Sequence, residues 1–128
     1  MRDGFTLLEI VIILVVLSVL VAVGVPKIAS FREEAVAAVE AQNVAMIRIG
    51  INRYYIDSIL SSRSPLYAET LDGAAIGSFS SWENPFFTAI LHAPGLVQGG
   101  WTKLNDVRYR APGGDVYSYD PVNGSFTE

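Results

Sequence analysis

The sequence predicts an α+β fold, in which a long, kinked N-terminal helix packs against a small antiparallel sheet. Three observations support this prediction. An apolar run extends from Phe5 to Val25, helical periodicity continues to Leu60, and short alternating apolar segments follow after residue 100. A chain of 128 residues, 51% of them hydrophobic, has room for one domain beside the apolar run.

The run from Phe5 to Val25 is long enough to cross a bilayer as a helix, which takes about 20 apolar residues. Three interpretations are open: a plain transmembrane anchor, a cleaved signal peptide, and a helix that leaves the bilayer and packs elsewhere. Glu9 counts against the first two interpretations. A carboxylate in the bilayer core costs about 2.5–3.5 kcal/mol, and Glu9 lies where a signal peptide would begin its apolar run.

Gly24 and Pro26 predict a kink, and not a break, near residues 22–26. Proline removes one helical hydrogen bond and bends the axis. Residues 27–60 are the amphipathic half of the same helix, which is expected to end in residues 61–65, a cluster rich in serine and closed by proline. The apolar stripe of this half consists of Val44, Ile47, Ile51, Tyr54 and Tyr55.

Residues 61–128 are expected to form a loop, a short helix and the sheet. Asn84-Pro85 predicts the start of the short helix, which would run to Leu91 and be stopped by Pro94-Gly95. The expected strands are 101–104, 107–111, 116–120 and a short edge piece at 125–127. Because such a small sheet is marginal in water alone, it should cover the apolar stripe of the helix.

Aromatic side chains are expected to fill the core between the sheet and the helix. The candidates are Phe86, Phe87, Trp101, Tyr109, Tyr117 and Tyr119. His92, the single histidine, is expected to cap the end of the short helix, where a cation is favourable. Asn123-Gly124-Ser125 fits a glycosylation sequon, but Asn-Gly is more typical of a turn.

The first residues resemble a type IV prepilin. Gly4-Phe5-Thr6-Leu7-Leu8-Glu9 matches the motif at which a dedicated peptidase cuts after glycine and the new N-terminal phenylalanine is N-methylated. Glu9 stands at the fifth mature position, and Pro26 falls where the family has its kinking proline. The motif covers about the first 30 residues, and the rest matches only in architecture. Asp3 departs from the basic leader that is usual in the family, and the absence of cysteine excludes its C-terminal disulfide.

The resemblance implies the lollipop shape of pilins and type II secretion pseudopilins. Residues 1–4 would be the leader, cleaved between Gly4 and Phe5, and residues 5–26 would be the transmembrane and filament-core half of the helix. In a filament, Glu9 would pair with the Phe5 amine of a neighbouring copy. Removing one member of a buried ion pair costs about 3–5 kcal/mol, so such a pair would enforce the register of assembly.

The expected function is therefore that of a structural subunit, a pilin of a type IV pilus-like filament. The alternative is a pseudopilin of a type II secretion filament, and a third possibility is a monomeric membrane-anchored binding module. The expected partners are copies of this chain or related pilins and the prepilin peptidase and methyltransferase. The precursor would lie in the bacterial inner membrane, and the product in an extracellular pilus or a periplasmic pseudopilus.

Other function classes have little support in the sequence. No metal cluster, phosphate-binding loop or pair of catalytic carboxylates is recognisable, so neither an enzyme nor a cofactor is expected. The net charge of −4, without a basic field, counts against nucleic acid as a partner. Asp115, Asp120 and Asn123 are candidate calcium ligands by residue type, but their spacing matches no calcium loop.

Overall fold

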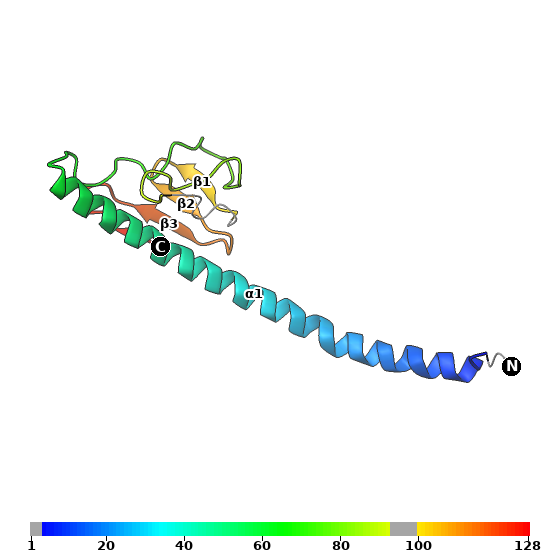
Figure 1. Cartoon of the computed structure of the whole chain (residues 1–128). Helices are drawn as coiled ribbons and strands as arrows, with labels where there is room; N and C mark the ends of the chain where they lie inside the picture. Colours follow the sequence, from blue (N-terminus) through cyan, green and yellow to red (C-terminus); the bar gives the residue numbers. More distant parts are fainter. Residues whose placement is uncertain (1–3, 93–99) are drawn as a thin grey trace. The chain divides into compact units, whose positions relative to one another are not determined.

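The computed structural model describes residues 4–92 and 100–128. It contains one long helix, α1 (Leu7–Leu60), and one four-stranded antiparallel sheet in the order β1-β2-β3-β4, which confirms the predicted α+β class (Figure 1). The strands are β1 (Thr102–Asn105), β2 (Arg108–Arg110), β3 (Val116–Tyr119) and β4 (Phe126–Thr127). The chain forms two compact units, Met1–Ala35 and Val36–Glu128, and each is described by itself.

The first unit contains the apolar part of α1. Its helix is long and apolar enough to cross a membrane, and none of its described residues is buried. Pro26 lies inside α1, and helical residues continue on both sides of it. The prediction that the chain is not broken at Gly24 and Pro26 is therefore confirmed.

The second unit has its core between the sheet and the last turns of α1. The predicted apolar stripe is confirmed, because Val44, Ile47 and Ile51 are buried and Tyr54 packs against them. Tyr55 stacks on Tyr67, with ring centroids 4.8 Å apart. The helix thus presents one face to the sheet, which supplies the apolar cover that a small sheet requires.

Helix α1 ends at Leu60, as predicted, and its end is held by local hydrogen bonds. Arg63 N donates to Ser58 O at 2.8 Å, and Ser62 has a φ of 50°. A residue with positive φ just beyond the last turn is the usual way to satisfy orphan carbonyls at a helix C-terminus. The next residues, Ser64 and Pro65, are not helical.

The turns that separate β2 from β3 and β3 from β4 lie at residues 112–115 and 120–124, whose proline, glycine, aspartate and asparagine favour turns. In β2, Tyr109 faces the core while Arg108 and Arg110 are exposed, which confirms the alternation read from the sequence. The turn before β3 needs glycine at Gly114, whose φ is 106°. Segment 77–80 pairs with the outer edge of β1. Gly77 N donates to Lys103 O, Lys103 N donates to Ser78 O, and Ser80 N donates to Trp101 O.

The short helix predicted over 84–91 is wrong. The described residues 81–92 form bends and isolated turns; Asn84 N donates to Ser81 O at 3.2 Å, and Leu91 N donates to Phe87 O at 3.0 Å. Phe87 has a φ of 60°, a left-handed conformation that a helix cannot contain. Burial of Phe86 and Phe87 in the core overrides the local helix signal of Asn84-Pro85. The predicted stop at Pro94-Gly95 lies outside the described residues.

Candidate functional site

The N-terminal segment carries most of the residues that the sequence predicts to be functional. Gly4 and Phe5 precede α1, and both are exposed. Thr6 caps the helix, because Glu9 N donates to Thr6 Oγ1 at 3.3 Å and to Thr6 O at 3.1 Å. Thr-x-x-Glu is the spacing of a capping box, a local signal that the sequence analysis did not use.

The place of Glu9 in the first turn of α1 gives its carboxylate a favourable position within its own helix. An acidic side chain in the first turn interacts favourably with the helix dipole by about 0.3–1 kcal/mol. This gain is smaller than the roughly 2.5–3.5 kcal/mol that a charge costs in a bilayer core. The helix dipole therefore explains why an acid is tolerated at Glu9, but it does not compensate for burial of that acid in lipid.

Gly24 and Pro26 lie in the interior of the exposed part of α1. Proline has no N–H, so the carbonyl of Ala22 loses its usual partner four residues on. A Cβ on Gly24 would meet no atom within 4 Å. Crowding by other atoms of this chain therefore does not require glycine at this position. The kink expected near Gly24 and Pro26 stays a prediction.

The three candidate calcium ligands are not brought together. Asp115 precedes β3, whereas Asp120 and Asn123 follow it, and five residues of extended chain cover about 16 Å. Asp120 Oδ1 accepts from Val122 N at 2.9 Å, and Asn123 Oδ1 accepts from Ser125 N at 2.8 Å. These oxygens therefore serve the turn before β4. Among residues 4–92 and 100–128, no cluster of three His, Cys, Asp or Glu side chains is placed to hold a metal ion.

Glu40 forms a buried polar contact between α1 and the sheet. Its carboxylate accepts from Gly113 N at 3.0 Å and from Tyr117 Oη at 3.1 Å. Burial, and then the hydrogen bond to Glu40, raise the pKa of Tyr117 to about 12. A signal was present in the sequence, because Glu40 lies on the same helical face as Val44, Ile47 and Ile51.

Lys103 and Asp72 form a buried ion pair. Lys103 Nζ lies 2.9 Å from Asp72 Oδ1 and also donates to Ala74 O at 3.0 Å. The other carboxylate oxygen of Asp72 accepts from Phe87 N at 3.3 Å. Asp72 thus links β1 to the irregular segment that carries Phe87. Backbone groups of Ala74 and Phe87 form the remaining hydrogen bonds of the two charged side chains.

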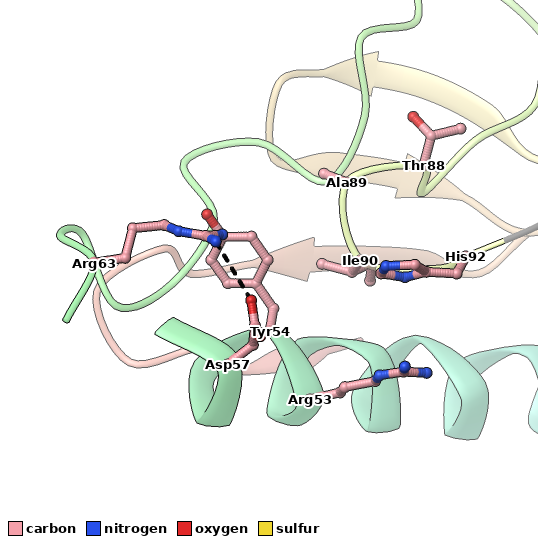
Figure 2. A pocket seen from close by; sticks show the side chains of 8 residues that line it. All are labelled: Arg53, Tyr54, Asp57, Arg63, Thr88, Ala89, Ile90 and His92. Atoms are coloured by element: carbon pink, nitrogen blue, oxygen red, sulfur yellow. Dashed lines mark ion pairs between the residues drawn. The ribbon is translucent and has the colours of Figure 1, made fainter. Parts of the chain in front are cut away.

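A groove lies between the last turns of α1 and the turn at 88–92. It includes a cavity of about 400 Å³ with Arg53, Arg63 and His92 in its wall (Figure 2). The helix end that His92 was expected to cap does not exist, so that prediction is wrong. No local pattern reveals this groove, because its walls come from residues about 40 positions apart.

Comparison of the chain with protein-family models, with curated proteins and with solved structures gives no match.

Proposed function

We propose that this chain is a structural subunit of a type IV pilus-like filament. It is made as a membrane precursor, cut between Gly4 and Phe5, N-methylated at Phe5 and assembled through residues 5–26. One observation carries the proposal. The apolar part of α1, which is hydrophobic on all sides and buries none of its residues, begins within the motif Gly4-Phe5-Thr6-Leu7-Leu8-Glu9.

The physical argument starts from the exposed apolar surface. Soluble proteins rarely leave a continuous apolar surface of this extent in water, and a helix that is hydrophobic on every side requires an apolar environment. Lipid supplies that environment before assembly, and neighbouring copies supply it afterwards. The gain from the helix dipole at Glu9 is too small to offset burial of the carboxylate, so in this proposal its counter-ion lies on another copy.

The second unit offers further support for side-by-side assembly. The face of α1 turned away from the sheet carries exposed apolar residues outside the cavities of this unit: Val39, Ile56 and Leu60. At about 100° per residue, Ile56 points roughly 180° away from buried Ile47. A helix with apolar residues on two opposite faces fits one partner within the chain and another outside it.

Intact mass spectrometry of the chain purified from its native membrane tests the processing step. The expected mass lacks residues 1–4 and includes one added methyl group on Phe5. A chain that starts at Met1, or one cut near Val25 as a signal peptide would be, contradicts the proposal.

A substitution at Glu9 tests the assembly step. Glu9→Ala should leave membrane insertion intact and abolish filaments, because the amine of Phe5 would lose its counter-ion. Glu34→Ala is the matched control, since Glu34 is an exposed carboxylate in the same unit. Normal filaments from the Glu9 variant would reject the pairing. A periplasmic filament beside a secretin would favour the pseudopilin alternative, and a stable monomer would favour the anchored binding module.

A further inference from the structure

Two adjoining cavities in the second unit share part of their lining. The larger, of about 400 Å³, lies above Tyr54, and the smaller, of about 160 Å³, lies beside Met46 and Ile49. Both are lined by Arg53, Ile90 and His92. We call this combined feature the Arg53 groove, and its larger part has the volume of a typical small-molecule site.

A cationic side chain and an imidazole meet in one part of the Arg53 groove. Arg53 and His92 come from opposite walls and extend toward the same end of the cavity (Figure 2). Within residues 4–92 and 100–128, no ion pair or hydrogen bond is formed by the Arg53 guanidinium. Arg63, at the other end, lies 3.5 Å from Asp57, but both side chains are at least half exposed, so that pair is weak.

The neighbouring part of the groove is apolar. Met46, Ile49 and Leu91 line it, and Arg53 stands at the boundary with the cationic part. Gly50 sets how closely the wall approaches the helix. A Cβ at Gly50 would lie 2.9 Å from Leu91 Cδ2 and 3.1 Å from Ile90 O, so a larger residue would displace the Leu91 side chain and the loop slightly from α1.

We propose that the Arg53 groove binds a small organic carboxylate that carries an apolar group of about the size of one ring. A guanidinium donates two parallel hydrogen bonds to a carboxylate, which favours that anion over a spherical one. The adjoining apolar wall gives the remainder of such a ligand a place out of water. An inorganic anion would contact only the part of the groove at Arg53, and a neutral apolar compound would contact only its apolar part.

This site is independent of the proposed filament. All of its lining residues belong to Val36–Glu128, and none belongs to residues 5–26 or to the motif at Glu9. Failure of assembly in the Glu9 variant would therefore leave the groove unchanged, and failure of the groove to bind would leave assembly unchanged.

The single histidine of the chain permits a direct binding experiment. The full-length protein, labelled with ¹³C in histidine and held in lipid nanodiscs, is titrated with phenylacetate while the His92 imidazole resonance is followed by NMR. Phenylacetamide, which lacks the charge, and inorganic phosphate, which lacks the ring, are titrated in parallel. The expected result is a saturable shift with phenylacetate at a half-saturation on the order of 1 mM, and binding at least about 10-fold weaker for both comparison compounds.

Variants of the arginine assign the effect to the groove. Arg53→Gln should weaken phenylacetate binding by about 10-fold, because a charge-assisted hydrogen bond is lost. Arg53→Lys keeps the charge but not the two parallel hydrogen bonds, so it should recover only part of the affinity. Arg108→Gln, at an exposed arginine on β2 outside the groove, should leave the affinity unchanged. The proposal is overturned if phenylacetate gives no saturable shift, if phosphate or phenylacetamide binds equally well, or if the Arg53→Gln and Arg108→Gln variants behave alike.

Discussion

The two parts of α1 differ in burial although both are rich in valine and isoleucine. No described residue is buried before position 36, whereas the later turns bury six residues. The difference lies in patterning. The later turns alternate apolar and polar residues at helical spacing, whereas the earlier turns are apolar on every side. Hydrophobicity alone therefore does not determine which residues the chain buries within itself.

The comparison also separates two sources of stability. In the second unit, full burial of a side chain such as Ile47 contributes about 1.5–3 kcal/mol, and the sheet of the same chain provides the cover. The first unit receives no such contribution from its own chain. Its helix depends on an environment outside the molecule, which in our proposal is lipid first and then other copies.

The largest expected effect concerns the buried ion pair of the second unit. Lys103→Met should lower the free energy of unfolding of that unit by about 3–5 kcal/mol, because Asp72 is left as an unpaired buried charge. Chemical denaturation followed by the fluorescence of buried Trp101 measures the loss. Combining Lys103→Met with Asp72→Asn should recover part of it. An equal loss in the double variant would mean that packing of Lys103, and not its charge, is responsible.

The next effect contrasts three isoleucines of α1. Ile47→Ala should cost about 2–5 kcal/mol of the unfolding free energy, because Ile47 is 0% exposed and its removal leaves a cavity. Ile49→Ala, at a residue 65% exposed, and Ile13→Ala, in the apolar half, should each change it by less than about 0.5 kcal/mol. A loss at Ile13 equal to that at Ile47 would remove the distinction between the two parts of the helix.

A smaller effect is expected where the helix meets the turn before β3. Glu40→Gln should cost about 1–3 kcal/mol of unfolding free energy, because an amide has only one oxygen to accept from Gly113 N and Tyr117 Oη. Glu34→Gln, at an exposed position, is the control and should have no effect. Equal melting temperatures for the two variants would show that the Glu40 contacts contribute little to stability.

The loss of folding stability at alkaline pH should occur in the second unit. Burial is the first cause that raises the pKa of Tyr117 and of Tyr119 to about 12 from 10.0, and it also raises the pKa of Tyr109. Because the folded state favours the neutral phenols, their stabilisation is complete below pH 10 and is lost as the pH rises from 10 toward 12.

Denaturation at a series of pH values checks this window. The smallest effect at neutral pH is expected for Tyr109→Phe, because the Tyr109 hydroxyl has no hydrogen-bond partner in the part of the chain that the structure describes. This variant should keep its stability at pH 7 and lose less of it above pH 10. An unchanged alkaline loss would place the titrating group elsewhere.

Local patterns were enough to predict α1, its end, the alternation in β2 and most of the aromatic core. These features depend on residues a few positions apart, so periodicity and turn chemistry reveal them. Thr6 also had a local signal, the capping-box spacing to Glu9, which the analysis of the sequence left unused.

The failures arise from contacts between distant residues. The short helix at 84–91 was wrong because core burial holds Phe87 in a left-handed conformation. The ion pair of Lys103 with Asp72 joins residues 31 positions apart, and no sequence pattern announces such a pairing. The Arg53 groove was missed for the same reason, because His92 reaches it only through the tertiary fold.

Disulfide crosslinking within the apolar half of α1 tests the central claim most directly. The chain has no cysteine, so Val16→Cys introduces a single thiol at an exposed position of that half. Oxidation in intact cells should join Val16→Cys chains into covalent dimers, whereas Arg108→Cys on β2 should give few, and adding Glu9→Ala should remove them. Monomers alone from Val16→Cys, under conditions in which the thiol is shown to be reactive, would contradict the claim that copies of this chain bury one another's apolar helices.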